Sequence, residues 1–439
     1  MDALAEPTAE RRRAVSWPVL VALLGAVLVW RSHELLFHPT MRVEDGAKVF
    51  SFFFDHRGFE HLFRFKSGYM PFLPNLVGYV AVRIPLRASP YLMTVLPTAF
   101  AVFAYGSFFA KPFRAVVPDD RVRFATCLAL ALAPVGQFYL VSHTDFSIWN
   151  ALFCVILWAW VPLPASFLGA GLAVLGQELL VWTHPLSFVA APLNLLQLRR
   201  AKTWRGRVAQ GSMLVGHAAH LAFGLERRRA GRALEVDAGD LLLRTIEYVS
   251  RSIQRSLGGP MLEGSWRADA PLVGGALALV FVAAVAWVAV KNVGGMRVPV
   301  LLGAYAVVAV TAAVVASKTD RQIDQGIRYL YVQSLFCVLL TCCLLAPLLE
   351  RLAASFARSF PASPALALVP LVAVFATQNL GATGRYVERK RGDNAERVAA
   401  CMSRLTALEA DNGGPCGFSL TCEKPDDWPI SVKLPACRR

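Results

Sequence analysis

The chain of 439 residues contains few charged residues. Asp, Glu, Lys and Arg make up 17% of it, whereas apolar types make up 56%. A soluble protein of this composition would expose large apolar patches and aggregate, which a bilayer would prevent by covering them. A membrane-spanning backbone has to be helical or a closed barrel. The apolar runs here are continuous over about 20 residues each, which favours helices over alternating barrel strands.

Several motifs of soluble enzymes are also missing. The sequence has no glycine-rich phosphate loop, no His-Glu-x-x-His zinc motif and no nucleophile elbow. We therefore predict no metal site and no firm cofactor. Internal repeats and inverted-repeat symmetry are absent, which lowers the expectation of a transporter. The first apolar run lacks a signal-peptidase cleavage site, so we expect it to remain as a span.

The net charge of +15 comes mainly from basic residues in short loops, so we expect no nucleic-acid partner. Positive charge is retained on the cytoplasmic side of a membrane. The arginines at 11–13 therefore indicate a cytoplasmic N-terminus, and the basic segment 199–207 indicates a cytoplasmic loop. About 11 spans then bring the C-terminus to the periplasmic side of a bacterial inner membrane. The expected spans are 17–37, 90–110, 124–141, 146–162, 166–182, 186–198, 208–225, 272–290, 298–317, 327–349 and 361–380.

These spans predict an all-α polytopic membrane protein in which residues 1–380 form one transmembrane module. Two long external loops interrupt it, at 38–89 and 226–270. The first carries a short interfacial helix at 70–85, and the second an amphipathic stretch at 240–257.

Residues 381–439 form a small external tail with four cysteines, Cys401, Cys416, Cys422 and Cys437. In an oxidising compartment four cysteines predict two disulfides, with three possible pairings. We favour Cys416 with Cys422 and Cys401 with Cys437.

The first external loop contains the adjacent carboxylates Glu44 and Asp45. An acid just outside a membrane boundary is suited to act as a general base, because an acceptor hydroxyl would meet a lipid-borne donor there. A solvated turn that ends at Gly46 is the alternative.

Further candidates lie at the expected outer ends of later spans. Asp145 and His143 occupy a very short outer loop, where Asp145 could alternatively cap the next helix. Glu178 lies inside an apolar run, where an ionisable group is costly and indicates function. His184 follows near the outer mouth. Interhelical pairing between such groups is the alternative interpretation.

A group of cations is expected at an outer boundary. Lys318, Arg321 and Arg328, with Tyr329 beside Arg328, could hold the phosphate of a polyprenyl-phosphate sugar as it leaves. Lys66 in the first loop is a weaker candidate. Snorkelling of long cationic side chains to the interface is the alternative.

The order of these motifs resembles the GT-C superfamily of integral-membrane glycosyltransferases. The resemblance rests on Glu44-Asp45 after the first span, Gly68-Tyr69 to Pro74 before a short apolar helix, Asp145 in the next outer loop, and Arg328-Tyr329 at a late span. It covers the N-terminal third best, and later parts match only in span order.

The resemblance implies an inverting transfer of a sugar from a polyprenyl-phosphate donor on the periplasmic side. Asp45 would be the base, with Glu44 as support or alternate. Asp145 would be the second acid, Arg328 the phosphate contact, and Tyr69 a further substrate contact. The acceptor could be a glycan, a lipid or a protein. Some branches of the superfamily use a divalent metal, which two carboxylate sites separated by a whole span do not favour.

Two other functions remain open. An O-antigen-type polymerase or ligase would depend on cations of a late external loop, such as Arg244 or Arg251. A transporter or flippase for lipid-linked sugars would need a polar path through the membrane midplane, for which Glu178 is the candidate. Polar residues gathered at the outer end would favour the transferase, and polar residues across the whole bundle the transporter.

Overall fold

The computed structural model describes most of the helical part of the chain and a short hairpin near its end. The described residues are 16–37, 49–65, 69–85, 88–133, 139–164, 166–228, 237–258, 270–317, 327–356, 373, 419–424 and 427–433.

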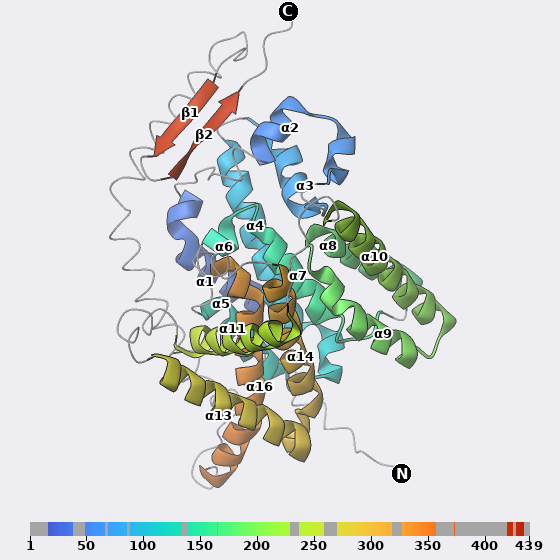
Figure 1. Cartoon of the computed structure of the whole chain (residues 1–439), viewed down its shortest axis with the longest axis vertical. Coiled ribbons are helices and arrows are strands. Elements are labelled where there is room, and N and C mark those ends of the chain that lie inside the picture. The colour runs from blue at the N-terminus through green and yellow to red at the C-terminus, as the bar shows by residue number, and fades with distance from the viewer. Residues whose placement is uncertain are drawn as a thin grey trace, which may run out of the picture.

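Within these ranges the chain is helical except for the hairpin (Figure 1). The described parts of the predicted spans are mainly helical, with a break inside 124–141, so the helical class is confirmed. The span at 361–380 lies outside the described residues except for position 373. The main helices are α1 (Trp17–Phe37), α2 (Ser51–Asp55), η3 (Phe59–Phe63), α3 (Phe72–Ala81), α4 (Ser89–Gly106), α5 (Asp120–Leu132), α6 (Tyr139–Ser142), α7 (Ser147–Trp158), α8 (Phe167–Thr183), α9 (Ala191–Arg200), α10 (Trp204–Arg228), α11 (Ala238–Gly258), α13 (Ala270–Lys291), α14 (Arg297–Ser317) and α16 (Tyr331–Phe356). Short 3₁₀ turns join some of them, namely η5 (Ser107–Phe109), η6 (Lys111–Ala115), η7 (Ser187–Ala190), η8 (Val293–Gly295) and η9 (Ile327–Leu330).

Helix α16 occupies the centre of the bundle and packs against α5, α7, α11 and α14. Its described apolar residues are almost all buried, as expected for a helix that is apolar on every side. Phe336 packs against Phe153 of α7, with ring centroids 4.9 Å apart. Helix α14 approaches α16 closely at Gly303, where a Cβ would come within 2.7 Å of the Leu340 side chain.

Three stretches within the described ranges are long and apolar enough to cross a membrane. They are Ser89–Ala115, Arg297–Ser317 and Arg328–Pro347. Five further apolar helices are shorter, namely Trp17–His33, Phe72–Ala81, Ser147–Trp158, Phe167–Thr183 and Ala278–Lys291.

The segment predicted as a span at 124–141 is not one continuous helix. Helix α5 ends at Leu132, and Ala133 has an extended backbone (φ −59°, ψ 137°). The next residue is Pro134, and a residue that precedes proline is sterically disfavoured in the helical region. Arg31 of α1 donates a hydrogen bond to the carbonyl of Ala131, one of the last carbonyls of α5 that has no partner within the helix. A cation at this position also suits the negative end of the helix dipole.

The described residues of the first long loop form a small cap at one end of the bundle, at the top in Figure 1. Val49, Phe53 and Leu62 form a local apolar core with residues of α3 and α4. The Asn75 side chain of α3 donates hydrogen bonds to the carbonyls of Leu62 (3.0 Å) and Arg64 (3.3 Å), which fastens η3 to α3. Helix α3 in turn packs against α4, α7 and α8, so the cap is attached to the bundle.

The amphipathic stretch expected at 240–257 forms α11, which crosses α14 and α16 and also packs on α13 (Figure 1). Its small polar residues Ser252 and Ser256 are fully buried, whereas Leu242 and Leu243 are exposed. This arrangement, with small polar residues at the helix interface and leucines outside, is typical of helices packed within lipid.

The tail contains an element that the sequence analysis did not predict. Strands β1 (Ser419–Lys424) and β2 (Asp427–Lys433) form an antiparallel hairpin in which Cys422 pairs with Ile430. The other three tail cysteines lie outside the described residues, so the expected disulfides stay a prediction.

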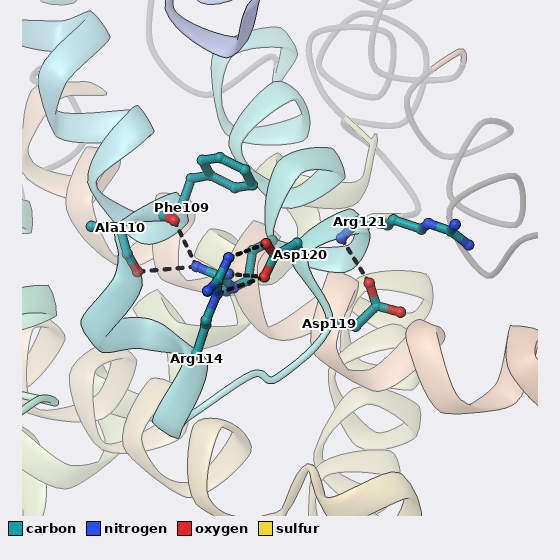
Figure 2. A network of polar contacts seen from close by, with 7 residues as sticks. Phe109, Ala110, Arg114, Asp119, Asp120 and Arg121 are labelled. Carbon is teal, nitrogen blue, oxygen red and sulfur yellow. Dashed lines mark hydrogen bonds and ion pairs between the residues drawn. The ribbon is translucent and has the colours of Figure 1, made fainter. Parts of the chain in front are cut away.

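A charged cluster connects the end of α4 to the start of α5 (Figure 2). Arg123 is fully buried and donates from Nη1 to the carbonyls of Phe109 (2.6 Å) and Ala110 (3.0 Å). Its Nη2 forms an ion pair with Asp120, which also accepts from Arg114 Nε at 2.9 Å. Burial by itself raises the pKa of the Asp120 carboxyl group, but the two arginines outweigh burial and hold that pKa below its ordinary value.

We predict that Asp120→Asn destabilises the protein by about 2–3 kcal/mol, because it leaves the buried Arg123 without its counter-charge. The matched control is Asp119→Asn. Asp119 caps α5 by accepting from the Arg121 N–H (2.7 Å), and Asn caps equally well, so this change should stay within about 0.5 kcal/mol. Thermal unfolding of the purified variants in detergent measures both. Equal losses for the two variants would contradict the role of the cluster.

The contribution of Asp120 to the stability of the fold should also depend on pH. The folded pKa of Asp120 lies below the unfolded value of about 3.9, so its stabilisation is complete above about pH 5. It is lost as the pH falls through the folded pKa, and the wild type should approach Asp120→Asn there.

Candidate functional site

Several of the predicted outer residues gather around Trp149, in the first turn of α7. The indole ring of Trp149 lies 4.5 Å from the imidazole ring of His184 and 5.6 Å from the ring of Tyr329, measured between centroids. His184 follows α8, and Tyr329 belongs to η9, which leads into α16. Three segments that are far apart in the sequence thus meet at one place. We call this arrangement the Trp149 cluster.

Arg328 connects this cluster to the loop that contains Asp145. Its guanidinium carbon is 5.2 Å from the ring centroid of Tyr329 and 5.5 Å from that of Phe146. The His143 ring also contacts Phe146, with centroids 6.1 Å apart. The half-buried Asp145 lies between His143 and Phe146 in the chain. A cation, a carboxylate and two imidazoles therefore share this end of the bundle.

Backbone and hydroxyl contacts hold the 143–146 turn in position. The Thr144 hydroxyl donates to the carbonyl of Met93 in α4 at 2.7 Å, and the Ser147 hydroxyl donates to the carbonyl of Thr144 at 2.7 Å. The N-cap position of α7 is occupied by Phe146, without a side-chain capping bond. Asp145 is thus not at the capping position that the sequence suggested as its alternative role.

The contacts of His184 define its tautomer. Its ring is buried, and Nδ1 accepts a hydrogen bond from the Leu186 N–H at 3.1 Å. An accepting Nδ1 carries no proton, so the neutral ring is protonated at Nε2. The turn after α8 therefore presents an N–H donor, and not a free base, at the Nε2 position.

A second set of buried polar groups adjoins the Trp149 cluster in the chain. The Tyr331 hydroxyl donates to Asn150 Oδ1 at 3.0 Å and forms a very short hydrogen bond with the Tyr105 hydroxyl. These bonds connect α16, α7 and α4. Tyr331 and Asn150 each follow a residue of the cluster closely in the chain. Their hydrogen bond therefore fixes how α16 and α7 are placed along each other, and with it the contact between Tyr329 and Trp149. Neither residue was predicted as part of a site from the sequence, although a polar residue inside an apolar run was the available signal.

Glu178 does not belong to this cluster. Its carboxylate lies against Gly216 of α10, where a Cβ would come within 2.0 Å of the Oε2 atom. It lines a cavity of about 860 Å³ between α8, α10 and the segments 162–164 and 200–206. Glu178 and His184 are six residues apart, which corresponds to about 9 Å along a helix, and they face different parts of the molecule.

Polar side chains also follow the contact between α9 and α10. The Asn194 side chain donates to His217 Nε2 at 2.9 Å. The Ser187 hydroxyl donates to the carbonyl of Val181, so its oxygen accepts from His220 Nδ1 at 3.0 Å. Gln197, one turn before the basic loop, donates to the carbonyl of Trp160 at 2.8 Å. Buried polar groups therefore extend from the Gln197 end of α9 toward the His184 turn.

Tyr69 lies just before α3 and is half-buried. Other predicted site residues lie outside the described residues, so their positions stay predictions, namely Glu44, Asp45, Lys66, Lys318 and Arg321.

The described side chains can bind an anion more readily than a metal ion. Arg328 supplies a cation next to aromatic rings, and a guanidinium is suited to a phosphate. No group of three His, Cys, Asp or Glu side chains among the described residues is close enough to hold a metal ion.

Comparisons with known proteins do not assign this chain to a group. No family model matches the sequence, and neither a curated protein nor a solved structure matches it.

We predict that Tyr331→Phe destabilises the protein by about 1–3 kcal/mol, because it leaves the buried Asn150 Oδ1 without its donor. Tyr79→Phe is the matched control, since Tyr79 is half-buried and its ring packs in the cap. This variant should unfold within about 0.5 kcal/mol of the wild type. Thermal unfolding in detergent distinguishes the two, and an unchanged Tyr331→Phe would contradict the supporting role of this network.

Proposed function

We propose that this protein is a polytopic membrane glycosyltransferase of the GT-C type. It transfers a sugar from a polyprenyl-phosphate donor to an acceptor hydroxyl on the periplasmic side of a bacterial inner membrane. The observation that supports the proposal most is the Trp149 cluster, which brings Arg328 next to the loop of Asp145. Helix α3 of the first loop packs against α7 and α8, so the loop of the proposed base is attached to the same part of the bundle.

The proposed topology has about 11 spans, with the N-terminus inside and the C-terminus outside. Long apolar stretches support a membrane location. The arrangement of α11 supports it further, because Leu242, Leu243 and Ile246 are more than half exposed while serines face the helix interface. In water such a surface would favour aggregation.

The proposed reaction is a direct displacement. Asp45 accepts the proton of the acceptor hydroxyl, and the oxygen attacks the anomeric carbon of the sugar. The bond between that carbon and the phosphate oxygen breaks, its electron pair stays with the phosphate, and the configuration inverts. Arg328 stabilises the charge that develops on the leaving phosphate, as a preorganised cation does in a site with little water. Asp145 serves as a second acid near the acceptor.

A transporter or flippase for lipid-linked sugars is the second candidate, and one observation favours it. Buried polar groups are not confined to the Trp149 cluster, since Asn194, His217 and Gln197 lie along α9 and α10 toward the basic loop. Polar groups across a bundle are typical of a path through a membrane. Less supports the polymerase or ligase alternative, because Arg251 already forms an ion pair with Glu247 of the same helix at 2.6 Å.

The test is a transfer assay with the purified full-length protein and a radiolabelled pool of polyprenyl-phosphate sugars. Asp45→Asn should abolish transfer, because the base is lost. Arg328→Gln should lower the rate about 100-fold or more, as removal of one transition-state donor does. Glu60→Gln and Arg251→Gln are the controls, since Glu60 is an exposed acid of the same loop, and both should retain the wild-type rate.

Other results would separate the candidates. Transfer that survives Asp45→Asn would contradict the assigned base. If Arg251→Gln abolishes transfer while Asp45→Asn retains it, the polymerase or ligase is favoured. Binding of the labelled lipid without transfer, unchanged in Asp45→Asn, would favour the transporter.

A further inference from the structure

The cavity that contains Glu178 is separate from the Trp149 cluster. Its volume of about 860 Å³ lies within the range of about 300–1,000 Å³ that holds a bound small molecule. Helices α8 and α10 form its long walls, and the segment that joins α9 to α10 forms its mouth. Figure 1 shows α8, α9 and α10 grouped together on one flank of the bundle.

The mouth is cationic. Arg200, Lys202 and Arg205 line it, and within the described part of the chain none of the three forms an ion pair with a carboxylate. The sequence contains no Asp or Glu between Glu178 and Glu226, so nothing nearby in the chain neutralises them. Three cations around one opening attract an anion, and a phosphate suits guanidinium and ammonium groups.

The walls are apolar and open to the outside of the bundle. Phe167, Leu175, Trp204 and Val208 line the cavity and are each more than half exposed. Exposed apolar side chains beside an opening provide a surface for a hydrocarbon chain. Trp204 next to Arg205 is the combination found where a helix enters the headgroup region of a bilayer.

The inner part of the cavity contains polar atoms without partners. Gln210 is 4% exposed and its Oε1 has no hydrogen-bond partner, and Oε1 of Glu178 likewise has none. A buried polar atom without a partner costs free energy, and its usual explanation is a missing water or ligand. Gln210 lies six residues after Trp204 in α10, which corresponds to about 9 Å along the helix.

We propose that this cavity binds a phosphate-bearing lipid on the side of the membrane opposite the Trp149 cluster. The phosphate of the lipid contacts Arg200, Lys202 and Arg205. The polar groups of the lipid that adjoin the phosphate contact Gln210, and its hydrocarbon chain lies along Phe167 and Leu175. The proposal rests on the membrane location proposed above, and not on the transfer reaction. Basic pockets between transmembrane helices on the cytoplasmic side are a known form of lipid-headgroup site.

Native mass spectrometry of the full-length protein in detergent provides the test. The probes are phosphatidylglycerol, phosphatidylcholine with the same acyl chains, a polyprenyl phosphate, and inorganic phosphate. The wild type should retain one anionic lipid at concentrations at which phosphatidylcholine and inorganic phosphate do not bind. Each neutralised cation should weaken binding about fivefold, so the combined variant Arg200→Gln, Lys202→Gln and Arg205→Gln should lose it by about 100-fold.

A matched pair of glycine variants tests the cavity itself. Gly171 lines the cavity and Gly176 does not, yet both lie in α8 and a Cβ added at either would meet no atom within 4 Å. Gly171→Phe should therefore block binding, whereas Gly176→Phe should bind like the wild type. Thermal unfolding of both checks that they fold. If Gly171→Phe does not fold, the charge variant alone decides the outcome.

The two lipid probes distinguish the sources of the phosphate. Preference for phosphatidylglycerol would identify a membrane phospholipid, and preference for the polyprenyl phosphate would identify a carrier lipid. Binding of phosphatidylcholine as strong as that of phosphatidylglycerol, or retention of the anionic lipid by Gly171→Phe and by the charge variant, would overturn the proposal. These readouts do not involve sugar transfer, so they stand or fall independently of the transferase assay.

Discussion

The hydrogen bonds of Tyr331 are the constraint on which the candidate site depends. Tyr331 lies in the first turn of the central helix α16, where it bonds Asn150 of α7 and Tyr105 of α4. In an apolar interior a tyrosine hydroxyl without a hydrogen-bond partner costs free energy. The bonds therefore fix the position of the three helices along one another. In this position Tyr329 contacts Trp149, and Trp149 contacts His184. Arg328 directly precedes Tyr329 in the chain, so its position follows from that of Tyr329.

The two polar regions of the molecule differ in how their groups are satisfied. Around Tyr331 the two tyrosine hydroxyl groups bond each other and Asn150 Oδ1, which suits a fixed framework, and only Asn150 Nδ2 has no partner in this network. In the Glu178 cavity, by contrast, Oε1 atoms of Glu178 and Gln210 have no partner, and the cations at the mouth have no counter-ion among the described residues. A network of hydroxyl groups that bond one another supports structure, whereas cations without a counter-ion at an opening are suited to bind an anion.

The sequence predicted the helices well because continuous apolar runs leave few other solutions. It failed at α5, where the apolar run continues beyond Leu132 but the helix ends there. The signal for this end in the sequence is Pro134, which disfavours a helical conformation of the residue before it. It also failed to anticipate the orientation of α11. An amphipathic pattern predicts a helix in water or in lipid alike, but Leu242 faces outward and Ser252 inward, the reverse of the order in a soluble protein.

The site was predictable only in part, for a similar reason. A common side of the membrane was enough to suggest that Asp145, His184 and Arg328 belong together, since short outer loops meet at one surface. Trp149 joins them through packing that no spacing in the sequence reveals. Glu178 was grouped with His184 because the two lie close in the chain. In the structure the Glu178 carboxylate instead lies against Gly216 of α10, away from His184.

We propose that the Trp149 cluster and the basic cavity lie on opposite sides of a membrane. Labelling with a membrane-impermeant thiol reagent tests it, with Glu60→Cys and Lys202→Cys made separately in a chain whose tail cysteines are replaced by serine. The remaining five cysteines are buried and should not react. We expect Glu60→Cys to be labelled in intact spheroplasts and Lys202→Cys to be labelled only after permeabilisation. Labelling of both variants in intact spheroplasts, or of neither, would contradict it.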